Sequence, residues 1–217
     1  MIMVGRPHGV HMYVAVVVFD GFDNLDAIGP FEVFGHAREG GADLSVDLCS
    51  VTPQSVVESN HGLRIEPSRS LLDRSGSVAI DPDLVVVPGG GWRSDRQDGV
   101  RAVVDRGELP SAISTLAERE STVASVCTGA MVLASAGLLT DRPAITHHSA
   151  IDDLREAGAT VTEARVVDDG DILTAGGVTS GIDLAIHLVN RTFGGSLASD
   201  VARVMEYDAT AAHVVTD

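Results

Sequence analysis

The sequence contains no lysine, and all 15 residues counted as lysine or arginine are arginines. This absence excludes a P-loop, in which a lysine contacts the nucleotide phosphates. It also excludes enzymes that form a Schiff base through lysine, including those that attach pyridoxal phosphate in this way. Neither nucleotide-dependent phosphoryl transfer of the P-loop type nor pyridoxal chemistry is therefore expected.

Basic residues are also few in relation to acidic ones. Aspartate and glutamate together number 31, and the formal net charge at pH 7 is −16. Such a surface repels nucleic-acid phosphates and anionic lipid headgroups, so we expect no nucleic-acid partner and no membrane partner. An acidic, strongly hydrated surface is typical of proteins that stay dissolved in concentrated salt. A halophilic source and an ordinary acidic protein both remain open.

Cysteine, aromatic residues and long apolar runs are scarce as well. Two cysteines, Cys49 and Cys127, are too few for a disulfide framework, which favours a reducing, cytoplasmic location. No apolar stretch is long enough to cross a bilayer, and the first apolar run, 13–19, does not resemble a signal peptide. Aromatic residues make up 4% of the chain against 44% hydrophobic residues in all, so Val, Ala, Leu and Ile must form most of the core.

Strand-like and helix-like stretches alternate along the 217 residues. Continuous apolar runs predict buried strands, and apolar residues at helical spacing predict helices between them. The expected strands are 13–19, 45–51, 83–87, 122–126 and a strand end at 144–147, with a hairpin of 161–167 and 171–174 and a short hairpin or arm within 54–80. The expected helices are 25–38, 100–117, 128–136, 151–157, 182–193 and 197–207.

This alternation predicts an α/β fold with a doubly wound, mostly parallel sheet flanked by helices. We expect a single domain over residues 12–208, with flexible termini at 1–11 and 209–217. In this architecture ligands bind beyond the carboxyl ends of the strands. We therefore expect the functional residues in the loops that follow the predicted strands.

Cys127 lies where the strand 122–126 gives way to a helix, in the sequence Ser-Val-Cys-Thr-Gly-Ala. A side chain at such a turn is exposed above the sheet. The adjoining helix N-terminus stabilises negative charge and is expected to lower the pKa of the thiol. Gly129 and Ala130 allow close packing at the turn. A nucleophile is one interpretation, and a buried structural cysteine, as we expect for Cys49, is the other.

Two further stretches gain a role if they face this thiol. Pro88-Gly89-Gly90-Gly91 ends a predicted strand, where glycines can present backbone N–H groups to a ligand oxygen; a plain tight loop is the alternative. Asp26, near a helix start, would ordinarily be a cap. Beside the thiol, a partly desolvated Asp26 can keep its proton and act as general acid and base.

The remaining histidines and acidic residues do not indicate a second catalytic or metal site. His147 and His148 are adjacent on an extended segment and point to opposite faces, and no His-x-x-x-His or Cys-x-x-Cys accompanies them, so we predict no metal site. We expect His147 in a pocket or at a strand end. Asp183 is expected to cap a helix. The stretch Thr174-Ala175-Gly176-Gly177 either borders the pocket or allows close strand–helix packing.

Taken in order, these motifs resemble the ThiJ/PfpI superfamily over about residues 13–193. The resemblance rests on Leu-Asp-x-x-Gly-Pro-x-Glu-Val at 25–33, Pro-Gly-Gly at 88–90, Val-Cys-Thr-Gly at 126–129, Ala-Gly-Leu-Leu at 136–139, Thr-His at 146–147 and Thr-Ala-Gly-Gly-x-x-x-Gly-Ile-Asp at 174–183. The chain is most similar to the isonitrile hydratase branch, because Thr128 rather than histidine follows the cysteine and Asp26 precedes Pro30 by four residues.

The resemblance implies a flavodoxin-like fold of the class I glutamine amidotransferase kind, a small-molecule substrate and a homodimer. It implies Cys127 as nucleophile, Asp26 as proton donor and acceptor, and Thr128 hydrogen-bonded near the thiol. It also implies an anion hole of backbone N–H groups around Gly90 and Thr128. The further substrate-binding positions are Gly89, Gly91, Gly129 and His147. One departure concerns the pocket lining, because the branch commonly has Thr-His-Trp where this chain has Thr-His-His at 146–148.

The leading hypothesis is therefore a hydratase that adds water to a small isonitrile and releases an N-substituted formamide, with no cofactor and no metal. One alternative is a glyoxalase- or amidase-like activity on small carbonyl compounds. The other is a non-catalytic sensor that binds a ligand or responds to oxidants through Cys127. A glutaminase is not expected, because neither His187 nor His213 is followed by the glutamate of that Cys-His-Glu triad.

Overall fold

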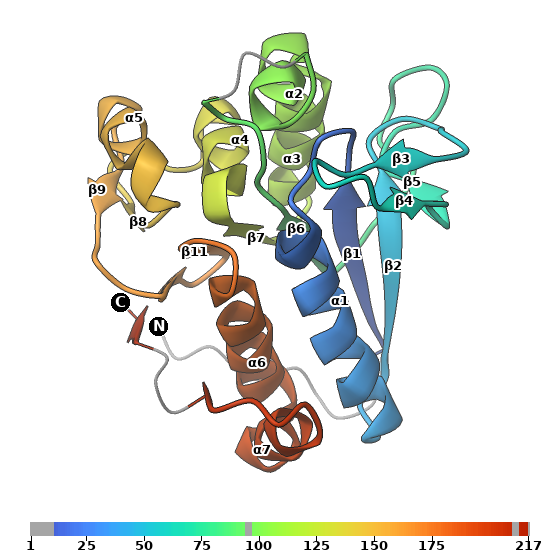
Figure 1. Ribbon diagram of the computed structural model, residues 1–217, viewed down its shortest axis with the longest axis vertical. Helices are drawn as coiled ribbons and strands as arrows, with labels where there is room; N and C mark the ends of the chain where they lie inside the picture. The colour runs from blue at the N-terminus through green and yellow to red at the C-terminus, as the bar shows by residue number, and fades with distance from the viewer. Residues whose placement is uncertain (1–10, 94–96, 210–212, 217) are drawn as a thin grey trace.

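An eight-stranded sheet forms the centre of the computed structural model, which describes residues 11–93, 97–209 and 213–216 (Figure 1). Its strand order is β12-β10-β11-β7-β6-β1-β2-β5. These strands are β1 (Met12–Val18), β2 (Leu44–Ser50), β5 (Arg69–Ser70), β6 (Leu84–Val87), β7 (Thr122–Val126), β10 (Val166–Asp169), β11 (Ile172–Ala175) and β12 (Val214–Thr216). All neighbouring pairs are parallel except β10 with β11. The predicted mostly parallel sheet is confirmed.

Two groups of helices cover the sheet (Figure 1). One group contains α1 (Asn24–Glu39), α6 (Ser180–Phe193) and α7 (Gly195–Val204), and the other contains α2 (Val100–Arg106), α3 (Glu108–Glu118) and α4 (Ala130–Ser135). Right-handed crossovers on either side of β1 place the groups on opposite faces. The central strands are consequently buried on both faces, which explains their unbroken valine runs. The doubly wound α/β fold predicted from the sequence is confirmed.

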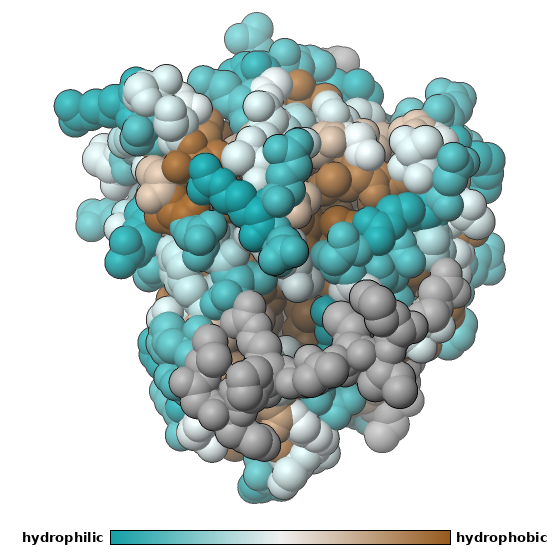
Figure 2. Space-filling view, turned by 180° about the vertical axis from the view of Figure 1, so that it is seen from behind, coloured by the Kyte–Doolittle hydropathy of each residue, from teal (hydrophilic) through white to brown (hydrophobic). Residues whose placement is uncertain are grey.

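Small elements lie outside this sheet. β3 (Val57–Glu58) and β4 (Arg64–Ile65) form the short antiparallel arm expected within 54–80. β8 (Pro143–Ala144) and β9 (Thr160–Val161) form a separate parallel pair beside α5 (Ile151–Glu156). Single 3-10 turns occur at Cys127–Gly129 and His148–Ala150. Seen from behind, the surface is mostly hydrophilic with apolar patches between polar side chains, as the charge of −16 leads one to expect (Figure 2).

Several predicted boundaries were wrong. The helix expected over 100–117 is two helices, because Gly107 adopts a left-handed conformation (φ +77°) and its N–H caps α2 at Val103 and Val104. The strand expected over 161–167 is divided, because Thr160–Val161 pairs with β8 and only Val166–Asp169 pairs with β11. The strand end expected at 144–147 stops at Ala144. The helix expected over 128–136 begins with a 3-10 turn at 127–129, and its α-helical part is Ala130–Ser135.

The carboxyl-terminal segment expected to be flexible contains one further strand. Val214–Thr216 form β12, which pairs parallel with β10, and the carbonyl of His213 accepts hydrogen bonds from the N–H groups of Arg165 and Val166. At the other end, residues 1–10 lie outside the described residues. His11 is described, and its ring bonds to Asp43 and Ser45. In the described part of the chain, no helix is both long enough and apolar enough to cross a membrane.

Candidate active site

Three loops meet where the parallel strands β1, β6 and β7 end. These strands are neighbours in the sheet, so the segments that follow them lie along the same edge. They are residues 19–23, the glycine loop 88–91 and the turn that begins at Cys127. The chain reverses its winding direction between β1 and β6, which is the place where doubly wound sheets bind their ligands.

Cys127 lies on a strained turn directly after β7. Its φ is +58°, a left-handed conformation that non-glycine residues rarely adopt. Two hydrogen bonds hold it there: its N–H donates to the carbonyl of Gly176 (2.8 Å), and its carbonyl accepts from Thr146 Oγ1 (2.8 Å). Strained residues of this kind persist where the surroundings fix them, and they concentrate at functional sites. The side chain is 7% exposed.

Gly129 allows this turn to pack against the end of β6. A Cβ atom at this position would lie 2.2 Å from the carbonyl oxygen of Val87 and 2.9 Å from that of Pro88. Both contacts are with backbone, which cannot move aside. Any larger residue would therefore push the cysteine turn away from the sheet, so the structure gives Gly129 a packing role at the site.

Asp26, in the first turn of α1, lies against the thiol. The residue is fully buried, its Oδ2 accepts a hydrogen bond from the N–H of Gly89 (3.0 Å), and the thiol of Cys127 is within hydrogen-bonding reach. Among the described residues, Oδ1 has no regular hydrogen-bond partner. Burial, and then the nearby charge of Asp23, raise the pKa of Asp26 to about 7. Near neutral pH this carboxyl group can therefore both give and take a proton.

The thiol does not have the low pKa that the sequence predicted. Burial, and then the neighbouring Asp26 carboxylate, raise the pKa of Cys127 to about 12. The N–H groups of Thr128 and Val178 donate to the sulfur and favour the thiolate, but desolvation outweighs them. The helix that follows the cysteine begins with a single 3-10 turn and is short, so it offers little compensating dipole. A thiolate at this position is therefore scarce near neutral pH, and the Asp26 carboxyl group is the neighbouring group that can take the thiol proton.

The glycine loop holds the acid and the threonine. The N–H of Gly89 donates to Asp26, and the N–H of Gly90 donates to Thr128 Oγ1 (3.0 Å). A Cβ at Gly89 would lie 2.6 Å from the Thr128 nitrogen and 2.9 Å from Asp26 Oδ2, so only glycine permits this approach. Gly91 follows with φ +68° and leads to Trp92.

The structure therefore corrects the anion hole expected around Gly90. The N–H of Gly90 is taken by the threonine hydroxyl, and the second N–H at the sulfur comes from Val178. Val178 has φ +41°, a strained conformation for a β-branched residue. Sequence reasoning missed it, although the preceding Gly176-Gly177 pair was a signal that the backbone approaches another group there.

His147 lies beside Val178 and packs on Gly177, where a Cβ would be 2.6 Å from the imidazole Cδ2. Its Nδ1 accepts from the N–H of Ser149, so the neutral ring carries its proton on Nε2. Burial, and then the neighbouring His148, lower the pKa of His147. The two histidines contribute to the lining of a pocket of about 520 Å³ that also includes Thr146 and Val178. Among the described residues, no group of three or more His, Cys, Asp or Glu side chains could hold a metal ion.

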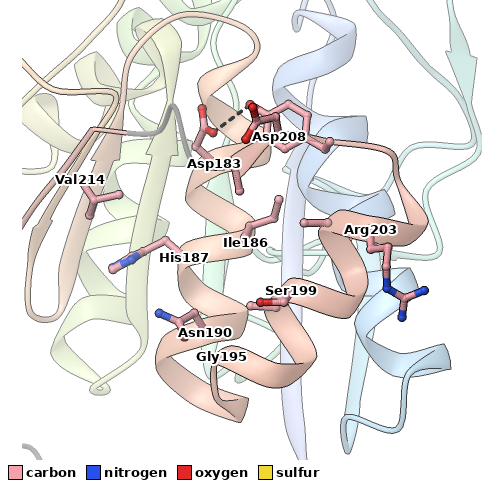
Figure 3. Close-up of a pocket in the computed structure, with 13 residues that line it drawn as sticks. Asp183, Ile186, His187, Asn190, Gly195, Ser199, Arg203, Asp208 and Val214 are labelled. Atoms are coloured by element: carbon pink, nitrogen blue, oxygen red, sulfur yellow. Dashed lines mark hydrogen bonds between the residues drawn. The ribbon is translucent and has the colours of Figure 1, made fainter.

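Asp183 does not cap α6, contrary to the prediction. It lies inside the helix, is 2% exposed, and its carboxylate accepts hydrogen bonds from Arg165 Nε (2.6 Å) and the Tyr207 hydroxyl (2.8 Å). It borders a pocket of about 540 Å³ between α6 and α7, where Ile186 on α6 and Ser199 on α7 also lie (Figure 3). Cys127 is not among the residues that line this pocket.

Comparison with known proteins adds to this geometry. The profile of the DJ-1/PfpI family matches residues 12–191. Isonitrile hydratase of Pseudomonas putida is 32% identical over 197 residues, which cover 90% of this chain and 78% of that protein. Protein DJ-1 homolog A of Arabidopsis thaliana is 28% identical over 88% of this chain and 46% of that protein. The crystal structure of a ThiJ/PfpI family protein from Pseudomonas syringae aligns with a TM-score of 0.80 at 29% identity, covering 92% of this chain and 76% of that one.

Proposed function

This chain belongs to the DJ-1/PfpI family, and from that premise we propose that it is a cysteine-dependent hydratase that converts small isonitriles to N-substituted formamides. The observation that carries the proposal is the contact of a buried Asp26, with its pKa raised to about 7, with the Cys127 thiol. Similarity to the Pseudomonas putida isonitrile hydratase supports the choice of substrate class.

In the first half of the proposed reaction, the sulfur of Cys127 attacks the terminal carbon of the isonitrile. The thiol proton passes to the Asp26 carboxylate as the carbon–sulfur bond forms, and Asp26 then delivers it to the same carbon. The product is a thioimidate, R–N=CH–S–Cys127. Because the thiol pKa is about 12, free thiolate is scarce, and the adjacent base lets attack and proton transfer proceed together.

In the second half, water adds to the thioimidate carbon. Asp26 takes a proton from the water and transfers it to the nitrogen, and the carbon–sulfur bond then breaks as the remaining hydroxyl becomes the formyl carbonyl. The hydroxyl proton returns to the sulfur by way of Asp26, which releases R–NH–CHO and the free thiol. The N–H groups of Thr128 and Val178 stabilise the negative charge on the departing sulfur.

The geometry favours this chemistry over the two alternatives. Attack on a carbonyl develops charge on an oxygen and needs free donors around it, yet the N–H groups of Gly89 and Gly90 are engaged by Asp26 and Thr128. Attack on an isonitrile develops charge on carbon, which a proton from Asp26 neutralises. A redox sensor requires an accessible thiol of low pKa, whereas Cys127 is 7% exposed and its pKa is raised.

Formamide release from a simple aromatic isonitrile, followed in low and in high salt, tests the proposal. We expect turnover by the wild type and by Cys49→Ala, the matched control that removes the other buried thiol. We expect no measurable turnover by Cys127→Ala. Normal turnover by Cys127→Ala, or no turnover by the wild type in either salt, would overturn the proposal. Product analysis with methylglyoxal and with peroxide would then separate the carbonyl enzyme from the sensor.

A further inference from the structure

Trp92, immediately after the glycine loop, is fastened to a helix far away in the sequence. The indole is 7% exposed, and its Nε1–H donates to Asp153 Oδ2 on α5 (2.9 Å). The guanidinium of Arg101 on α2 lies 3.6 Å from the ring centroid on its face. The ring is therefore held by a hydrogen bond that it donates to α5 and by a cation–π contact with α2.

We propose that Asp153 is a positioning residue for the reacting groups, acting through Trp92 and the glycine loop on Asp26 and Thr128. Each link is a direct contact or a neighbouring peptide bond. Asp153 fixes the indole, the indole fixes the end of the loop, and the N–H groups of Gly89 and Gly90 fix the carboxyl and hydroxyl groups. Measuring this role by isonitrile turnover rests on the proposed function. Measuring it by the reactivity of the Cys127 thiol does not.

The loop needs such an anchor because its backbone is intrinsically compliant. Gly90 and Gly91 have φ values of +122° and +68°, in regions where glycine moves freely between conformations. The first half of the loop has anchors of its own, since the Gly89 carbonyl accepts from Asp23 N–H (2.9 Å) and the Gly90 carbonyl accepts from Val100 N–H (2.7 Å). Trp92 adds an anchor at the end of the second half. Losing it should shift Gly91 and, through the adjoining peptide bond, the N–H of Gly90 that holds Thr128, without unfolding the protein.

The partly buried hydrogen bond from Trp92 matters more than the second, exposed bond that Asp153 accepts. Arg93 also donates to Asp153 Oδ2 (2.9 Å), but its side chain is 57% exposed, and exposed ion pairs contribute little. The indole N–H donates to Asp153 from a ring that is 7% exposed, where a donor left without a partner is costly. The effect of Asp153 should therefore pass through Trp92.

A double-mutant cycle on kcat/KM for an aromatic isonitrile tests that route. We expect Asp153→Ala and Trp92→Phe each to lower kcat/KM about tenfold, at the low end of the losses seen when the hydrogen-bond partner of a metal ligand is removed. The kcat/KM of the double variant should be no lower than that of the less active single variant, because both changes remove the same hydrogen bond. The matched control is Asp152→Ala, which lies one residue away on α5 and whose exposed carboxylate pairs with Arg155. Multiplicative losses in the double variant, or equal losses in Asp153→Ala and Asp152→Ala, would overturn the proposal.

The pH dependence of Cys127 alkylation by iodoacetamide provides a readout that a purely structural role would not move. It is measured in the Cys49→Ala background, so that Cys127 is the one thiol that reacts. The lower midpoint of the alkylation profile reports the titration of Asp26. The hydrogen bond from the N–H of Gly89 lowers the pKa of Asp26, so a looser loop should raise that midpoint. We expect this rise in Asp153→Ala and not in Asp152→Ala. Far-UV circular dichroism establishes that the variants are folded.

The two assays separate the failure of each proposal. A midpoint shift in a protein that does not turn over isonitriles would overturn the hydratase and support the role of Asp153. Turnover by the wild type, with unchanged alkylation profiles and unchanged kcat/KM in folded Asp153→Ala, would overturn the role of Asp153 alone.

Discussion

The two cysteines of this chain share burial and a raised pKa but differ in their surroundings. Cys49 is fully buried, and its thiol pKa is raised to about 11, while that of Cys127 is raised to about 12. Cys49 lies in the regular strand β2, paired with Val17, and its sulfur contacts the Tyr13 hydroxyl (3.7 Å). Cys127 lies on a left-handed turn with two N–H groups and a buried acid at its sulfur. Burial and raised pKa therefore do not distinguish a nucleophile from a core thiol.

The aspartate beside each thiol makes the difference. Asp47, which acts on Cys49, has a side chain that is 26% exposed, and it binds Arg69 (3.0 Å) and Ser68 (2.9 Å). Asp26 is fully buried and has no cation within ion-pair distance among the described residues. The Cys127 site therefore pairs a thiol with a buried acid whose pKa of about 7 allows proton exchange near neutral pH.

Replacing each of the two aspartates by asparagine should give the largest difference in activity between the two cysteine sites. We expect Asp26→Asn to lower kcat by about 10²- to 10⁴-fold, because an amide cannot carry protons between sulfur, carbon and water. Asp47→Asn should leave kcat within about twofold of the wild type, as is usual for a surface charge far from the chemistry. Steady-state formamide release measures both, and equal losses in the two variants would break the comparison.

Methyl groups added to two glycines should have the next largest effect. Gly89→Ala places a Cβ between the Thr128 backbone and Asp26, and a displacement approaching 1 Å at reacting groups costs about 100-fold in kcat/KM. Gly35→Ala, on α1, meets nothing within 4 Å and should raise stability by up to about 1 kcal/mol without changing activity. Kinetics and thermal melts of both variants decide. Unimpaired activity in Gly89→Ala would show that the loop does not hold the two groups in register.

Asp26 should also make the stability of the folded protein depend on pH. Its folded pKa of about 7 lies above the ordinary 3.8, so between about pH 4 and pH 7 the folded state holds a proton that the unfolded state has lost. Stability should fall as pH rises through this window, by up to about 4 kcal/mol for this group. Asp26→Asn removes this titrating group and with it the pH-dependent contribution to stability. In urea unfolding, the free energy of unfolding of the variant relative to the wild type should therefore be higher at pH 8 than at pH 4. The same difference at both pH values would contradict the raised pKa.

The residues alone left the meeting of Asp26 and Cys127 conditional, and the family resemblance implied it; strand alternation predicted only that ligands bind at the carboxyl ends of the strands. The strand 122–126 has the predicted bounds, and the strand 83–87 differs by one residue. Each follows from a local apolar run. The sequence also indicated close packing at Gly129, but it left a plain tight loop open as the alternative for Gly89, and the contacts of both glycines are known only from the structure.

The features that could not be predicted depend on contacts between distant segments. The direction of the Gly90 N–H, the arrival of Val178 at the sulfur and the raised thiol pKa are set by packing of β6, β7 and β11 together. β12 forms because Val214 and Val215 find an open edge at β10, which no local pattern reveals. Gly107, by contrast, was a visible signal for a helix break. The homodimer implied by the family resemblance stays a prediction, which sedimentation analysis would test.

Peptide mass spectrometry of acid-quenched protein, after brief incubation with excess isonitrile, tests most directly whether Cys127 is the nucleophile. The thioimidate retains every atom of the isonitrile, so the peptide that contains Cys127 should gain the full mass of the substrate, while the peptide that contains Cys49 should be unchanged. A gain on Cys49, or formamide formation that continues in Cys127→Ala without any adduct, would contradict the account.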